Sequence, residues 1–85
     1  ALALSSCTVS SEKLEYERAE KAAAKKDWPQ AVEHYKNVVE RHVASPLAVK
    51  SAEKAARISH YETKKFDEAA SLYKHVVLYS KDQKQ

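Results

Sequence analysis

Apolar residues recur at spacings of three and four along most of the chain, which is the pattern of amphipathic helices. Four such segments follow one another between short polar breaks, at about residues 11–25, 28–42, 46–64 and 67–81. β-branched runs, which favour strands, are limited to pairs such as Val38-Val39. The pattern therefore predicts an all-α chain of four helices.

The sequence also marks where these helices begin. Ser45 directly precedes Pro46, and a capping serine followed by proline at the first helical position is a strong start signal. Asp27 precedes the second helix, with an amide side chain three residues on, in an arrangement that resembles a capping box. Ser10 or Ser11 is a suitable cap for the first helix.

An internal repeat links the second and fourth helices, because residues 28–39 match residues 66–77 at an offset of 38 positions. A period of this size is typical of repeat proteins. The match fails over the first and third helices, so we expect those helices or their turns to differ by a residue or more. The repeat predicts two antiparallel helical hairpins stacked side by side, with four aromatic residues filling the space between helices rich in alanine: Trp28, Tyr35, Phe66 and Tyr73.

Composition supports a helical chain and argues against nucleic-acid binding. The 85 residues include no glycine and two prolines, so few turns can rely on glycine for a positive φ. The net charge is +3, from 15 lysines and arginines against 12 acidic residues. Lysines alternate with glutamates and form no basic stripe of the kind that tracks a phosphate backbone.

No pattern in the sequence indicates catalysis or metal binding. A helical metal site commonly uses two histidines four residues apart, and none of the four histidines is spaced that way: His34, His42, His60 and His75. The sequence contains no recognisable motif of a Ser/His/Asp catalytic triad and no glycine-rich phosphate loop. We therefore expect no enzymatic activity, metal, cofactor, small-molecule substrate or nucleic-acid partner.

The spacing aromatic-x-x-Ala-x-x-x-Tyr-x-x-Val occurs twice, beginning at Trp28 and at Phe66, and resembles the second helix of a tetratricopeptide (TPR) repeat. The resemblance covers about residues 14–80 and implies a short solenoid that binds proteins. In such arrays the first helix of each hairpin lines a concave groove. On that basis six residues are expected to form a mixed aromatic and charged groove for a peptide or a partner helix: Lys13, Tyr16, Glu20, Lys54, Tyr61 and Glu62.

The end of the chain provides a second candidate surface. Two hairpins are few for a solenoid, which usually needs three or more repeats to bury its core. The fourth helix therefore has a face that a further hairpin would cover. We expect Val77, Leu78 and Tyr79 on this face to contact a partner or a second copy of the chain.

Residues 1–11 differ in character from the charged remainder, and we place a boundary there between a leader with its tether and a helical domain at 12–85. Leu4-Ser5-Ser6-Cys7 resembles a bacterial lipobox, in which small residues precede a cysteine that accepts lipid. The resemblance implies a trimmed signal peptide, lipidation at Cys7 and a flexible tether from Thr8 onward. Thr8 is not the aspartate that retains such proteins at the inner membrane, so the outer membrane is favoured.

These observations together predict a non-enzymatic adaptor, anchored by lipid to the outer membrane and facing the periplasm, that acts in an envelope assembly. The TPR lipoproteins of the periplasm are the family members it most resembles. One alternative is a soluble TPR-like module in which Cys7 is incidental. A second is a three-helix trafficking module, which the break at Ser45-Pro46 disfavours.

Overall fold

The computed structural model describes residues 2–83, and the side chains of residues 11–80. It contains four α-helices and one π-helical turn, with no strand in this part of the chain. The all-α prediction is therefore confirmed. The elements, in chain order, are α1 (Leu2–Ala24), α2 (Trp28–Arg41), α3 (Pro46–Arg57), η1 (Ile58–Glu62) and α4 (Phe66–Gln83).

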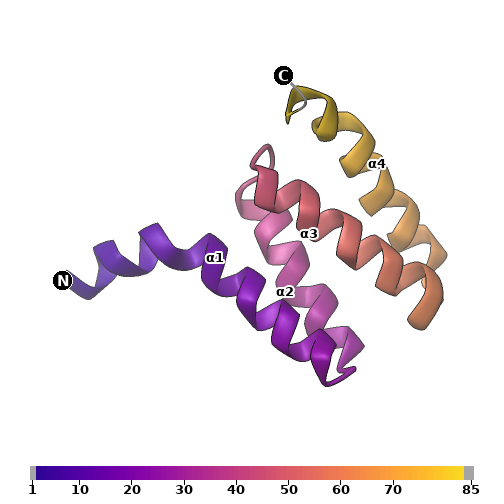
Figure 1. Cartoon of the computed structure of the whole chain (residues 1–85), viewed down its shortest axis with the longest axis horizontal. Helices are drawn as coiled ribbons and strands as arrows, with labels where there is room; N and C mark the ends of the chain where they lie inside the picture. Colours follow the sequence, from indigo (N-terminus) through magenta and orange to yellow (C-terminus); the bar gives the residue numbers. More distant parts are fainter. Residues whose placement is uncertain (1, 84–85) are drawn as a thin grey trace.

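Successive helices pack against one another and form two antiparallel hairpins (Figure 1). The first consists of α1 and α2, and the second of α3 with η1 and α4. The hairpins meet where α3 packs against α2. As a result α2 lies between α1 and α3, whereas in the part of the chain that the structure describes the backbone of α4 approaches only α3 and η1 closely.

Helix α3 starts where the sequence predicted. The Ser45 hydroxyl accepts a hydrogen bond from the Ala48 amide at 3.0 Å, and Pro46 occupies the first helical position. The same hydroxyl donates to the Glu12 carboxylate of α1, so the cap also joins the hairpins. Asp27 is the residue before α2, but its side chain makes no capping hydrogen bond.

The start of α1 differs from the sequence prediction. The helix begins at Leu2, nine residues before the expected start near Ser11, and it includes the stretch assigned to a flexible tether. Ser10 and Ser11 lie inside the helix, so neither caps its start. No glycine or proline interrupts the chain before Pro29, so nothing stops the helix from extending toward the N-terminus, although residues 5–11 are weaker helix formers than alanine and leucine. At the other end α4 continues to Gln83, two residues beyond the expected end.

Each hairpin turn contains a lysine in the left-handed region, where glycine is the usual residue. Lys26 and Lys64 both have φ of 61°, and they are 38 positions apart, so the repeat includes the turns. After α1 the Lys26 amide donates to the Ala23 carbonyl and the Asp27 amide to the Ala22 carbonyl, both at 2.9 Å. This pair of bonds is the Schellman motif, formed here without glycine.

The π-helical turn explains why the repeat is obscure over the first and third helices. The Thr63 amide donates to the Ile58 carbonyl five residues earlier at 3.0 Å, so this turn holds one residue more than an α-helical turn. Ala19 and Ala56 have no exposed surface and are 37 positions apart, one fewer than the offset of the second helices. The two hairpins therefore share one pattern with a single extra residue in η1.

Small residues and a few large ones form the core. Ala19, Ala31 and the buried alanines of α3 have no exposed surface, and they let the helix backbones approach closely. Tyr35 and Val38 are the largest apolar side chains with under 2% exposure. Burial of a side chain of this size stabilises the fold by about 1.5–3 kcal/mol.

One of the four aromatic residues expected in the core lies at the surface. Tyr35 is buried, and Trp28 and Tyr73 pack against the core at its edge, but Phe66 is 58% exposed. Trp28 is close to α3, since it lines a hollow with Lys54 and Ile58. The equivalent residue Phe66 lies at the start of α4, and no helix after α4 covers it within the described residues.

Candidate functional site

Three of the six predicted groove residues come together around a single carboxylate. Glu20 of α1 accepts a hydrogen bond from Lys54 of α3 at 2.8 Å and another from the buried hydroxyl of Tyr35 in α2. The Lys54 ammonium also lies 5.5 Å from the centre of the Tyr16 ring, within the range of a cation–π contact. Tyr16 meets Tyr35 edge to face at 5.7 Å. We call Tyr16, Glu20, Tyr35 and Lys54 the inner cluster.

The inner cluster is electrostatically satisfied within the protein. Partial burial alone would raise the pKa of Glu20, but hydrogen bonds from Lys54 and Tyr35 outweigh it and hold that pKa below its ordinary value. The hydrogen bond to Glu20 raises the pKa of Lys54. Burial and the neighbouring carboxylate raise the pKa of Tyr35, so its hydroxyl keeps its proton. A ligand here must therefore compete with contacts that already join three helices.

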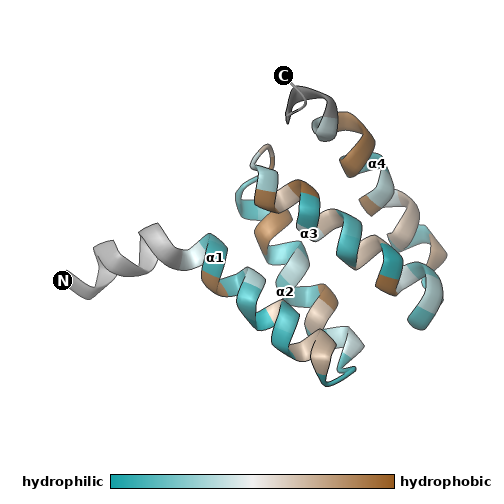
Figure 2. Cartoon of the chain, viewed as in Figure 1, coloured by the Kyte–Doolittle hydropathy of each residue, from teal (hydrophilic) through white to brown (hydrophobic). Residues whose placement is uncertain are grey.

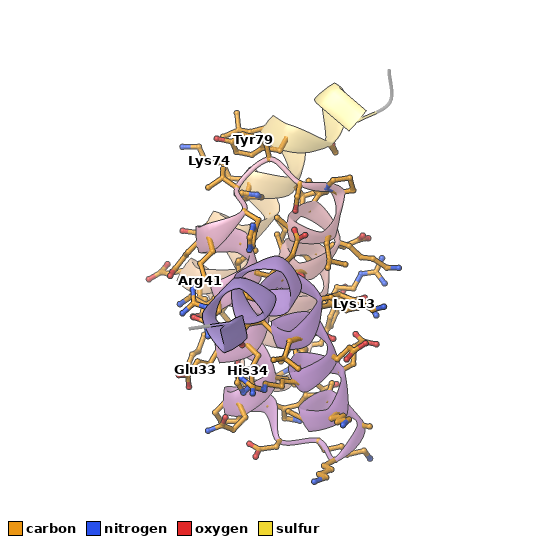
Figure 3. The ribbon with its side chains drawn as sticks, turned by 90° about the vertical axis from the view of Figure 1, so that its left-hand side faces the viewer. Lys13, Glu33, His34, Arg41, Lys74 and Tyr79 are labelled. Carbon is orange, nitrogen blue, oxygen red and sulfur yellow. The ribbon has the colours of Figure 1, made fainter. Side chains whose placement is uncertain are left out.

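The other predicted groove residues lie apart from this cluster. None of the described contacts joins Lys13, Tyr61 or Glu62 to it. Lys13 lies on the opposite side of the molecule from Arg41 and Glu33 (Figure 3). Tyr61 is 62% exposed on η1, and its ring stacks on that of His60 with centroids 4.3 Å apart.

Two polar networks were not predicted from the sequence. In the first hairpin Glu15 of α1 lies 2.6 Å from His34 Nδ1 and 3.8 Å from Arg41 Nη1, both on α2. Partial burial would raise the pKa of Glu15, but hydrogen bonds from His34 and Asn37 lower it overall. No local spacing signals these contacts, because the partners are 19 or more positions apart in the chain.

The second network joins the hairpins from the α2 side. Glu68 of α4 accepts from Lys36 of α2 at 2.9 Å and from the fully buried Ser59 of η1 at 3.1 Å. The hydrogen bond from Lys36 is the main reason that the pKa of Glu68 lies below its ordinary value. The residues of this network hold α4 in place on a side where its backbone does not approach α2 closely.

At three of four equivalent positions, the repeat exposes in α4 a residue that is buried or packed against the core in α2. Four residues of α2 form an apolar stripe at helical spacing that is buried or packed against the core, which we call the covered stripe: Trp28, Val32, Tyr35 and Val39. The residues 38 positions later form the terminal stripe of α4: Phe66, Ala70, Tyr73 and Val77. Phe66 and Val77 are 58% and 60% exposed, and Ala70 is also exposed. Figure 2 shows hydrophobic segments along α4 in brown.

His60 extends the aromatic surface at the start of the terminal stripe. Its ring meets those of Phe66 and Tyr73 edge to face, with centroids 5.9 and 6.2 Å apart. Tyr61 stacks against the same ring. The π-helical turn thus brings an exposed aromatic group next to an exposed helix face, which is a feature that the sequence pattern alone did not indicate.

The three residues predicted for the end face do not share one direction. Successive residues of an α-helix point about 100° apart, so Val77 and Leu78 lie on different faces although both are exposed. Tyr79 is half-buried and stacks on His75 with ring centroids 4.5 Å apart. It lies near Lys74 on α4 in Figure 3. Of the three, Val77 alone belongs to the terminal stripe.

Cys7 lies within α1, and its side chain is outside the part of the chain whose side chains are described. None of the helices in the described residues combines the length and apolar character that crossing a membrane requires. Within the same residues, no group of three His, Cys, Asp or Glu side chains is arranged to hold a metal ion. No family model, characterised protein or solved structure matches the chain.

Proposed function

We propose that this chain is a non-enzymatic protein-binding adaptor whose main contact surface is the terminal stripe. The observation that supports this most is the contrast between two equivalent stripes. Val39 is 8% exposed and Val77 is 60% exposed, although they occupy the same position in the repeat. Large apolar side chains that are exposed on one helix face are a candidate interaction surface.

The inner cluster is a second candidate surface, with less support. Its Glu20 and Lys54 already bind each other, so a partner gains little there without displacing them. No ion pair is described for the terminal stripe within residues 11–80, and its Phe66 and Val77 are 58% and 60% exposed. The resemblance of the repeat to the TPR family agrees with both surfaces, since that family binds proteins and stacks hairpins.

Capture of proteins from an envelope extract tests the adaptor function. We expect the wild-type chain to retain a partner and Val77→Lys to lose it, because a charge interrupts the stripe. Leu78→Lys is the matched control, since Leu78 is next to Val77 and 57% exposed but points about 100° away. Equal retention by the wild-type chain and Val77→Lys would contradict a role for the stripe.

For location, we propose lipid attachment at Cys7 and anchoring at the periplasmic face of the outer membrane. The support is the lipobox-like Leu4-Ser5-Ser6-Cys7. Stable anchoring of this kind needs more than one acyl chain, because each buried CH₂ contributes only about 0.8 kcal/mol. An adaptor attached in this way would present α4 to other envelope proteins.

Mass spectrometry of the protein from its native source tests the anchor. We expect acylation of Cys7, loss of the residues before it, and no acylation in Cys7→Ser. An unmodified Cys7 with those residues retained would instead support the soluble module. The adaptor function of the terminal stripe does not depend on this result.

A further inference from the structure

The covered stripe shows what kind of helix fits the equivalent surface of α4. Its neighbour α3 presents only small residues to the core, and these have no exposed surface: Ala48, Ser51, Ala52, Ala55 and Ala56. A helix face of alanine and serine lets the large side chains of α2 lie between two closely spaced backbones. The terminal stripe has the same tyrosine and valine at the same spacing, and an aromatic residue at its start.

We propose that the terminal stripe binds a partner helix that carries alanine or serine at the spacing found in α3, with a carboxylate where α3 has Lys54. This inference rests on the proposed adaptor function and specifies the partner. The partner helix would occupy, beside α4, the place that α3 occupies beside α2.

The carboxylate follows from the charges around the inner cluster. In the first hairpin Lys54 of the following helix binds Glu20, which also accepts from Tyr35. With the offset of 37 positions that relates Ala19 to Ala56, the position of Glu20 in the second hairpin is held by Arg57. Arg57 is 66% exposed, and its one described ion pair is with Glu53 on the same helix. A lysine on the partner would repel Arg57, whereas a glutamate would attract it.

The tyrosine of the second hairpin points to the same chemistry. Tyr35 donates to Glu20, but no acceptor is described for the equivalent Tyr73 hydroxyl within residues 11–80. Arg57 has no oxygen to accept this hydrogen bond. If Arg57 and Tyr73 stand to each other as Glu20 and Tyr35 do, a carboxylate on the partner helix would serve both, with the charges reversed from those of the first hairpin.

A second copy of this chain is a poorer occupant than such a helix. A second copy that continued the stack would present its α1 in the place of α3. At the offset of 37 positions Ala55 corresponds to Arg18 and Ile58 to Lys21, and both of these are exposed charged residues. Their long side chains would separate the backbones that alanine brings together.

A helical peptide copied from α3 tests the proposal with the full chain as receptor. The peptide spans residues 45–62, carries Lys54→Glu, and is held helical by a bridge between positions 53 and 57, which are exposed in the protein. We expect saturable binding by fluorescence anisotropy. Val77→Lys in the receptor should weaken binding at least about tenfold, while Leu78→Lys should change it less than about twofold. Both receptor variants are checked for unchanged helicity by circular dichroism.

The charge preference has its own test. The wild-type receptor should bind the Lys54→Glu peptide several-fold more tightly than the peptide with Lys54, and Arg57→Glu in the receptor should reverse that order. Failure of both peptides to bind the folded receptor overturns the inference, as does an unchanged order with Arg57→Glu. Sedimentation that shows self-association abolished by Val77→Lys would identify a second copy as the occupant and also overturn it. If neither peptide binds the receptor while capture from the envelope extract still depends on Val77, the adaptor function is retained and only the proposed chemistry of the partner helix is wrong.

Discussion

The buried hydroxyl of Tyr35 donates its hydrogen bond to the carboxylate of Glu20 across the first hairpin. Lys54 of α3 donates to the same carboxylate. The side chain of Glu20 therefore links its own helix, α1, to both α2 and α3. The second hairpin repeats the tyrosine as Tyr73 but not the acid. This difference makes the two tyrosines a natural pair for comparison.

Tyr35→Phe should lower the free energy of unfolding by about 1–2 kcal/mol, because it removes a hydrogen bond to a charged group while keeping the ring. Tyr73→Phe is the matched control and should change stability by less than about 0.5 kcal/mol, since no partner of its hydroxyl is described within residues 11–80. Urea unfolding followed by circular dichroism measures both. Equal losses for the two variants would contradict the role given to Glu20.

The protein should lose stability below about pH 5. The direction of this pH dependence follows from the pKa values of its glutamates. Glu15, Glu20 and Glu68 each have a pKa below the ordinary value of 4.5 in the folded state. Such groups stabilise the fold at pH values above 4.5, and this contribution disappears as the pH falls through the lower folded pKa. Melting temperatures measured between pH 3 and pH 7 should therefore rise with pH, most steeply at the acid end.

At high pH the raised pKa values of Lys36 and Lys54 act in the opposite sense. Their stabilising contribution is complete below the ordinary value of 10.5 and is lost as the pH rises above it. Glu20→Gln should flatten the acid side of the stability profile, and it should also reduce the loss at high pH because Lys54 no longer has a charged partner. If Glu20→Gln leaves the dependence of stability on pH unchanged, the ion pair between Glu20 and Lys54 does not contribute to stability.

Replacing the left-handed lysines with glycine should stabilise the protein. A residue with a Cβ atom in this region costs about 1 kcal/mol relative to glycine, so Lys26→Gly and Lys64→Gly should each raise the free energy of unfolding by up to about that amount. Lys21→Gly, inside α1, is the control and should lower it by about 0.5–1 kcal/mol. Thermal melts of the three variants test this directly, and destabilisation by Lys26→Gly would be inconsistent with the assigned turn.

Ser51 and Ser59, both fully buried, should respond differently to replacement by alanine. Ser59 donates to Glu68, so Ser59→Ala should destabilise the protein by about 1–2 kcal/mol. The Ser51 hydroxyl is buried with no partner in the described part of the chain, so Ser51→Ala should be neutral or stabilising by about 1 kcal/mol. Chemical denaturation compares the two variants, and a large loss with Ser51→Ala would indicate a partner for that hydroxyl.

The sequence predicted the features that depend on local pattern. The spacing of apolar residues located all four helices, and Ser45-Pro46 located the start of α3, because a cap and a proline act within one turn. The constant offset of 38 predicted the hairpins, and it also relates the left-handed residues Lys26 and Lys64.

The features that depend on contacts between distant parts of the chain were not predicted. Phe66 resembles Trp28 in sequence, yet its exposure depends on which helices pack against it, and a local pattern cannot show that. The pairing of Glu15 with His34 and of Glu68 with Lys36 likewise depends on how helices face each other. Of the six residues expected in the groove, three meet around Glu20, because they lie on parts of α1 and α3 that approach each other.

The extra residue of the second hairpin is held inside a helix and not in a loop. The turn at Ile58–Glu62 holds one residue more than an α-helical turn, and the backbone of Lys64 still has the same left-handed conformation as that of Lys26. The π-helical turn therefore accommodates a one-residue insertion locally. Without it, the insertion would rotate every later side chain by about 100° about the helix axis. A one-residue deletion within this turn should be tolerated, whereas the same deletion in α2 would turn its buried residues toward water.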